Sequence, residues 1–332
     1  MRKLILKTVS SLLMILCLAN SLSKASLIDE QKENKNIEGF IRVWAMVKYR
    51  SPKSVGGKFD ADSVFLANVD AVKKADHVAF NSLLLRMINK ADLPSVKKKL
   101  ISDGRDYLTI NENYKWINEK IYSKEVQFRL KDLSQNSNQT ENHHYINKVH
   151  FEGEILNEPK YLDYSSFKDA GMNLLALAKS WAAIEYLFPY KYQMDQNWDK
   201  TLNEFLPRII APESEKDFDL AMREISIKIN DTHASTQMPK LFEYFGDKFI
   251  PVDIKIIDQK AIVIGLKNDS LAKISDLKIG DVITKVEGKT IAEILKENLK
   301  YVEGSNEPSV LKNAYWAIFN GKTPTFEIEF IR

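Results

Sequence analysis

The sequence predicts an α+β protein, in which a mostly helical N-terminal region with a duplicated helical unit precedes a small β-barrel domain. Two observations support this fold class. Apolar residues recur at helical spacing in two segments that lie 137 positions apart, and such a stripe faces a core. After Phe245 the pattern changes to β-branched runs bounded by Gly and Asp, which is typical of strands.

The composition is that of an ordinary globular protein. The chain has 332 residues, 48 Lys+Arg against 45 Asp+Glu, and 44% hydrophobic residues, which excludes disordered, collagen-like and disulfide-stapled classes. A net charge of +3 gives no electrostatic reason to expect nucleic-acid binding. The length indicates two or three domains. We expect boundaries that separate residues 1–25, 26–133, 134–168, 169–244 and 245–332.

The first 25 residues have the pattern of a signal peptide. Basic residues at the start precede an apolar run from Val9 to Ala19, and the small-residue triplet Ser23-Lys24-Ala25 follows. This order predicts export and cleavage after Ala25. A membrane anchor is the alternative, but the run is shorter than the roughly 20 residues that span a bilayer.

Cleavage would remove the only cysteine, Cys17. The exported chain, periplasmic or extracellular, would then have no thiol for a nucleophile, a zinc ligand or a disulfide. We expect no membrane span after cleavage, no metal and no organic cofactor.

Two helices share an apolar stripe. The first stripe is Ile37, Phe40, Ile41, Trp44 and Val47, and the second is Leu174, Leu177, Ala178, Trp181 and Ile184. Both helices are expected to end before a proline, Pro52 or Pro189, because proline disfavours helix in the preceding residue. The two tryptophans are interpreted as core residues.

A second helix is expected in each copy of the duplication. The ranges are Asp62–Val72 and Asp199–Ile209, and each aspartate stands where it could cap the N-terminus of its helix. Two copies indicate a duplication and not a solenoid.

A polar connector separates the copies. Residues Ser134–Asn142 predict a loop, and His143, His144 and His150 follow it. The histidines suggest a metal site, but they have no Asp, Glu or His partner at a diagnostic interval, so a solvated loop is the favoured interpretation.

The last 88 residues predict short strands around two short helices, with Asp269-Ser270 as cap of the first and Gly288 in the turn before the second. The expected strands are Ile250–Ile257, Lys260–Leu266, Val282–Val286 and Thr325–Ile331, and the expected helices are Leu271–Ile274 and Ile291–Lys300.

Part of this region resembles a known module. The segment Leu271-Ala-Lys-Ile-Ser-Asp-Leu-Lys-Ile-Gly-Asp-Val-Ile283, followed by Val286-Glu-Gly288, is similar to the core signature of a PDZ domain. The small β-barrel expected here is therefore PDZ-like.

The region upstream resembles the tail-specific serine peptidases, the C-terminal processing and tricorn-like enzymes, and most closely their secreted bacterial members. The motifs are Trp181-x-x-x-x-Tyr-x-x-Pro189, Asn197-Trp-Asp199 and Asn230-Asp-Thr-His233. The resemblance implies that His233 is a general base and that Thr232 assists it. Imidazole suits a base near neutral pH. A hydrogen-bonded loop histidine is the alternative.

The nucleophile of that family is expected after the PDZ domain, whereas this sequence ends at Arg332. Ser270 and Lys273 have a Ser-Lys spacing, but they fall in the first turn of a predicted helix. No residue set supplies a nucleophile, a base and an oxyanion hole. We therefore expect a chain without a complete active site.

Recognition of peptides is the remaining function that the resemblance implies. PDZ domains bind an extended peptide as an added strand and hold its terminal carboxylate with backbone N–H groups. The resemblance places the carboxylate loop at Phe249, Ile250, Pro251 and Val252 and the edge strand within Pro251–Ile257, including Ile254. Peptide or unfolded-protein C-termini are the expected partners. The alternative is that this segment only packs against the helices.

Two functions of different classes therefore remain open. The chain is the substrate-binding portion of an exported serine peptidase, or it is an exported binding protein that holds peptides without cutting them. A carbohydrate-associated surface protein is a third, weaker hypothesis that rests only on export and aromatic content.

Overall fold

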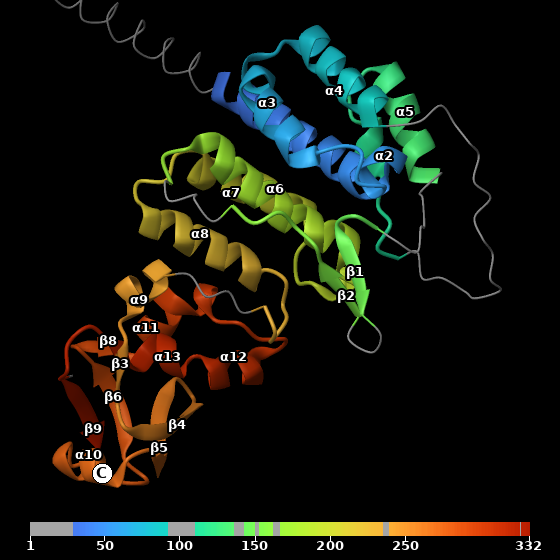
Figure 1. The fold of residues 1–332 in the computed structure, drawn as a ribbon. Helices are drawn as coiled ribbons and strands as arrows, with labels where there is room; N and C mark the ends of the chain where they lie inside the picture. Colours follow the sequence, from blue (N-terminus) through green and yellow to red (C-terminus); the bar gives the residue numbers. More distant parts are fainter. Residues whose placement is uncertain are drawn as a thin grey trace, which may run out of the picture. The chain divides into compact units, whose positions relative to one another are not determined.

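The computed structural model describes residues 29–91, 110–135, 143–149, 153–161, 167–234, 239–325 and 327–332 (Figure 1). The predicted signal peptide, His150 and residues 136–142 of the predicted polar loop lie outside these ranges. The fold is α+β, with helices in the N-terminal and middle parts and a small β-sheet in the C-terminal part. The chain forms two compact units: unit 1 is Met1–Leu162 with Leu174–Leu187, and unit 2 is Asp163–Asn173 with Phe188–Arg332.

Unit 1 is built from helices and one hairpin. A helix over residues 29–50 comes first. It is followed by α2 (Pro52–Val55), α3 (Ala61–Lys74), α4 (His77–Ala91), the 3-10 turn η1 (Lys115–Asn118), α5 (Lys124–Gln135), the antiparallel strands β1 (Ile146–Val149) and β2 (Gly153–Leu156), and most of α6 (Ala170–Leu187).

Both predicted apolar stripes are confirmed. All five residues of the first stripe are buried, and of the five residues of the second stripe only Ile184 is partly exposed. Trp44 and Trp181 are core residues, and the indole Nε1 of Trp44 donates to the carbonyl oxygen of Ala61 at 2.7 Å. Both helices end ahead of their proline. The second copy is divided between the units, because most of α6 belongs to unit 1 and α7 belongs to unit 2.

The predicted cap of α3 is wrong. Asp60 is the N-cap, and its Oδ1 accepts from Ser63 N–H at 3.0 Å. Asp62 instead lies inside the first turn, buried, with its Oδ1 3.0 Å from the Lys48 ammonium. Asp60, which caps the helix, and Asp62, which binds the buried cation, are only two residues apart. The sequence pattern alone does not distinguish their roles.

Lys48 lies at the centre of a buried ion cluster in unit 1. Its Nζ is 3.0 Å from Asp62 Oδ1 and 2.7 Å from Glu158 Oε2. Lys179 pairs with the same two carboxylates, at 3.1 and 3.0 Å. Two cations thus alternate with two anions. The Lys48 ammonium also lies 4.4 Å from the centre of the Tyr145 ring. The cluster satisfies charges that would be costly to bury alone.

His143 of the connector is held by the main chain around it. His143 Nε2 lies 3.2 Å from Tyr49 O, and His143 Nδ1 accepts from Tyr145 N–H at 3.1 Å. The loop prediction is wrong at Ser134 and Gln135, because α5 continues through Gln135. No group of three or more His, Cys, Asp or Glu residues suited to a metal ion occurs within the described ranges.

Unit 2 combines helices with the sheet. Its elements are the 3-10 turn η2 (Lys191–Gln193), α7 (Asp199–Ile210), α8 (Glu215–Ile227), α9 (Pro239–Phe245), β3 (Lys248–Phe249), β4 (Val252–Ile257), β5 (Lys260–Leu266), α10 (Asp269–Ile274), β6 (Val282–Val286), β7 (Lys289–Thr290), α11 (Ile291–Asn298), the 3-10 turn η3 (Leu299–Tyr301), α12 (Glu307–Asn313), α13 (Tyr315–Phe319), β8 (Asn320–Gly321) and β9 (Ile328–Ile331).

The C-terminal sheet is open. Its strands run in the order β4-β5-β6-β7, β9 also pairs with β6, and every pairing is antiparallel. A separate two-stranded ladder joins β3 to β8. The strands of the described ranges form no closed barrel, so the expected PDZ-like barrel is not confirmed. The predicted strands Lys260–Leu266 and Val282–Val286 are confirmed, whereas the strand predicted from Ile250 begins at Val252. Buried side chains between the sheet and helices α11 and α13 form the core, among them Val252, Val263, Ile283, Val302 and Phe319.

Three other local predictions need correction. Asn268 caps α10, and its Oδ1 accepts from Leu271 N–H at 3.0 Å, so Asp269 and Ser270 lie inside the helix. Asp199 is the first residue of α7 and not its cap, since the N-cap is Trp198, without a side-chain cap bond. The last strand begins at Ile328 and not at residue 325. Within the described ranges no helix is long and apolar enough to cross a membrane.

Candidate functional site

Strand β4 is an edge of the five-stranded sheet. Within the described ranges it pairs with β5 and with no other strand. The two strands are joined by Asp258 and Gln259, whose φ angles are 47° and 57°. Two positive φ values in a two-residue loop are typical of a type I′ hairpin. The flanking pair Ile257–Lys260 is then a hydrogen-bonded pair, and bonded and non-bonded pairs alternate along the ladder from there.

This alternation determines which backbone groups of β4 point away from the sheet. Val263, which lies opposite Ile254, donates its N–H to Asp281 O at 2.9 Å and accepts from Gly280 N–H at 2.9 Å. Its polar groups therefore point away from β4. Ile254 and Ile256 are the non-bonded positions, so their N–H and C=O groups face the open edge. Among the described residues no hydrogen bond to these groups is recorded.

A groove runs along this open edge. Its other wall is α12, which contacts β4, together with the first residues of α13 (Figure 1). The groove has a volume of about 1030 Å³. Its apolar lining includes Ile254, Ile256, Leu311, Tyr315 and Trp316, and charged residues on its walls include Asp253, Lys255, Lys267, Glu307 and Lys312.

Tyr315 joins the two walls at one end of the groove. Its hydroxyl donates to the carbonyl oxygen of Ile250 at 2.5 Å, just before β4 begins. Burial, together with the nearby Asp253 carboxylate, raises the pKa of Tyr315 above its ordinary value, so the hydroxyl remains a donor. The Lys267 ammonium lies 3.7 Å from the centre of the same ring.

Arg223 supports the helical wall from behind. Its Nε donates to Tyr301 O at 2.8 Å, and its Nη2 donates to the Glu303 carboxylate. Arg223 is buried and Glu303 lines the groove. The guanidinium therefore fixes the segment that leads into α12.

Only one of the predicted peptide-binding residues lines the groove, namely Ile254. Ile250 and Val252 are buried in the core, and Phe249 is exposed in the short β3–β8 ladder. Pro251 has no N–H to offer, and its carbonyl accepts from Lys267 N–H at 2.8 Å. The loop before β4 is thus poor in N–H groups that could hold an anion.

Sequence reasoning missed the helical wall. The capping box of α12, in which Asn306 and Ser309 exchange hydrogen bonds, was a usable signal. Lys267 had no such signal, because its ring contact involves a residue 48 positions away.

The predicted catalytic residues, His233 and Thr232, lie in an exposed loop. The His233 side chain is 95% exposed, and its Nδ1 lies 3.2 Å from Asp231 Oδ1. The same carboxylate oxygen accepts from His233 N–H at 2.7 Å. Thr232 does not contact the ring through any recorded bond; its Oγ1 lies 2.9 Å from Ser305 Oγ.

Thr232 and Ser305 are bonded in both directions. Thr232 N–H donates to Ser305 Oγ at 3.1 Å, and Ser305 N–H donates to Thr232 Oγ1 at 3.2 Å. The loop that carries His233 is thereby tied to the loop between Glu303 and Glu307. In the described part of the chain no hydroxyl is recorded as bonded to the imidazole, and residues 235–238 lie outside that part.

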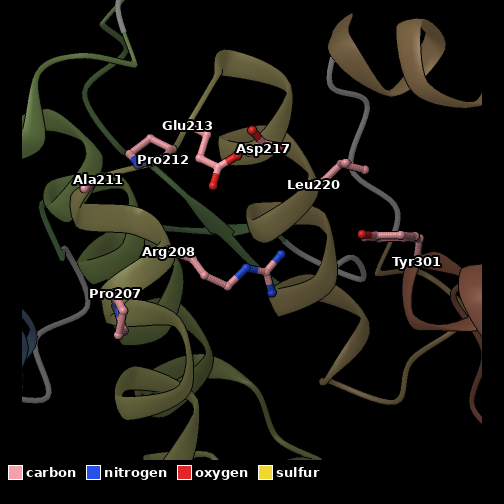
Figure 2. A pocket seen from close by; sticks show the side chains of 8 residues that line it. All are labelled: Pro207, Arg208, Ala211, Pro212, Glu213, Asp217, Leu220 and Tyr301. Atoms are coloured by element: carbon pink, nitrogen blue, oxygen red, sulfur yellow. The ribbon is translucent and has the colours of Figure 1, made fainter.

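A smaller hollow of about 430 Å³ lies where α7 turns into α8. Figure 2 shows Arg208 pointing toward α8, with Glu213 and Asp217 near the turn and Tyr301 reaching in from another segment. Its charged groups serve local structure: Arg208 pairs with Glu224 at 2.8 Å, and Asp217 accepts from Ser214 Oγ at 2.6 Å. The groove beside β4 is larger and has an open strand edge, so it is the stronger candidate.

No protein-family model, no curated protein and no solved structure matches this chain.

Proposed function

We propose that unit 2 binds an extended peptide as an additional strand on the open edge of β4. The outward N–H and C=O groups of Ile254 and Ile256 support this proposal most strongly. Each of the two residues presents one donor and one acceptor to the open edge, as a neighbouring strand requires. Each backbone hydrogen bond contributes only about 1 kcal/mol net. The apolar wall of α12 and α13 supplies the side-chain contacts that such binding also requires.

The proposal is tested with fluorescein-labelled decapeptides of varied C-terminal sequence and fluorescence anisotropy. The decisive variant is Leu311→Lys, which puts a charge on the apolar groove wall. Leu271→Lys is the matched control, because Leu271 is an exposed leucine of α10 that does not line the groove. We expect Leu311→Lys to weaken binding at least about tenfold and Leu271→Lys to leave it within about twofold.

Thermal unfolding of both variants verifies that they fold. Absence of binding by every peptide, or equal binding by folded wild type and Leu311→Lys, would contradict the proposal.

We further propose that this binding serves peptide hydrolysis of the tail-specific type, for which the resemblance of the sequence is the main support. The contact between Asp231 and His233 is consistent with it, since a carboxylate beside imidazole is the arrangement used to orient a general base. Binding without hydrolysis is the alternative. It is favoured by the exposure of His233 and by the engagement of Thr232 with Ser305.

Incubation with reduced, carboxymethylated casein tests whether His233 belongs to a complete hydrolytic site in this chain. We expect this chain by itself to release no fragments. Turnover that disappears in His233→Ala would instead support a complete hydrolytic site.

A further inference from the structure

The two ends of the groove differ. Tyr315, at the start of α13, bonds to Ile250 just before β4, whereas Glu307 and Pro308 at the start of α12 line the groove elsewhere. Tyr315 therefore marks the end of the groove at which β4 begins. A peptide that pairs antiparallel with β4, the slightly more stable pairing, would place its C-terminus near Tyr315.

The walls are joined at this end. The hydrogen bond between Tyr315 and Ile250 connects the helical wall to the entrance of β4. A peptide that lay along the edge of β4 would be blocked at this end by the Tyr315 side chain. The geometry thus favours a peptide that ends here over one that continues.

A terminal carboxylate at this end needs a donor or a cation. The loop before β4 offers little, because Pro251 has no N–H and its carbonyl is already an acceptor for Lys267 N–H. Lys267 supplies a cation at this end. Its ammonium lies 3.7 Å from the Tyr315 ring centre and 5.7 Å from the Phe249 ring centre.

The Lys267 ammonium retains hydrogen-bonding capacity. Its recorded ion-pair partner is Asp253, at 3.8 Å, which is too long for a hydrogen bond. An ammonium has three N–H donors. The two rings limit the positions of the side chain through cation–π contacts, so less freedom is lost when an anion binds.

We propose that Lys267 binds the terminal carboxylate of a peptide docked antiparallel on β4, in the role that backbone N–H groups would otherwise fill. This inference rests on the proposed function and adds to it the residue that makes the groove select free C-termini over internal segments.

The experiment uses the tightest-binding decapeptide in two forms, the free acid and the C-terminal amide. Wild-type protein is expected to bind the acid at least about tenfold more tightly, because a hydrogen bond to a charged group is lost in the amide. Lys267→Met should remove this difference by weakening the acid alone. Lys267→Arg should retain part of it.

Lys255→Met is the matched control, since Lys255 is another lysine of the same groove; it should leave the ratio of acid to amide binding unchanged. The amide also reports on folding, because a folded Lys267→Met variant still binds it as the wild type does. Equal wild-type affinity for acid and amide would overturn the assignment while leaving the groove proposal intact. So would a Lys267→Met variant that keeps the preference. Failure of both peptide forms to bind would count against the proposed function itself.

Discussion

The Lys48 ammonium lies 3.0 Å from the Asp62 carboxylate, and the two side chains are 0% and 1% exposed. Such a pair is stable only when its members neutralise each other and their remaining hydrogen-bonding capacity is used. Here Glu158 and Lys179 complete an alternating cluster, and Tyr161 donates its hydroxyl to Asp62 Oδ2 at 2.9 Å. This cluster ties the first helix to α3, to α6 and to the segment after β2.

Lys48→Met should destabilise unit 1 by about 3 kcal/mol, because it leaves two carboxylates with one cation in a buried site. Urea unfolding followed by circular dichroism measures the change. Lys73→Met is the control: Lys73 pairs with Asp70, whose side chain is 86% exposed, so the cost there should stay below about 0.5 kcal/mol. Equal costs for the two variants would contradict the structural role of the cluster.

Asp60→Ala and Asp62→Ala should differ in cost although the residues are two positions apart. Asp60 caps α3, and loss of a cap costs about 1 kcal/mol. Asp62 neutralises buried cations, so its loss should cost about 3 kcal/mol. The free energies of unfolding of the two variants test this order. The reverse order would support the cap predicted from sequence.

Unit 2 should lose stability in acid through Asp281. The Arg332 guanidinium donates to both carboxylate oxygens at 3.0 Å and, as the main cause, holds the pKa of Asp281 below its ordinary value. A lowered folded-state pKa means that the stabilisation is present above the unfolded pKa of about 4 and is lost as pH falls through the folded value.

Arg332→Gln removes the guanidinium that lowers the pKa of Asp281. The difference in urea midpoint between wild type and Arg332→Gln should therefore be largest near neutral pH and should narrow below about pH 4. A difference that stays constant between neutral pH and acid would show that the ion pair does not contribute in this way.

Thr232 and Ser305 should be energetically coupled. Their hydroxyls and N–H groups are bonded reciprocally, and residues in one hydrogen-bond network are not additive. A double-mutant cycle with Thr232→Ala and Ser305→Ala should give a coupling free energy of about 0.5 kcal/mol. Additive costs would mean that the two loops are independent.

Much of the fold could be predicted from local pattern. The apolar stripes around Trp44 and Trp181 were reliable because each extends over several helical turns. The strands β4 and β5 were evident from their β-branched runs. Caps were not reliable, because Asp60 and Asp62 have the same chemistry and only distant partners such as Lys179 determine which of them is buried.

The candidate site was predictable on one side only. Strand β4 is a local feature, but the opposite wall consists of two helices of seven and five residues, which are too short for periodicity to identify them firmly. The position of Lys267 over Tyr315 depends on how the strand and the helices pack. The assignment of Phe249, Ile250 and Val252 to a peptide came from the resemblance alone, and the structure places these residues in a short ladder or in the core.

Residue-specific amide hydrogen exchange tests the groove most directly. In the protein without peptide, the N–H groups of Ile254 and Ile256 should exchange fast, whereas those of Lys255 and Ile257, which face β5, should be slow. Addition of a binding decapeptide should slow Ile254 and Ile256 and leave the two neighbours nearly unchanged. Bound peptide with no slowing at Ile254 and Ile256 would show that β4 does not accept an added strand.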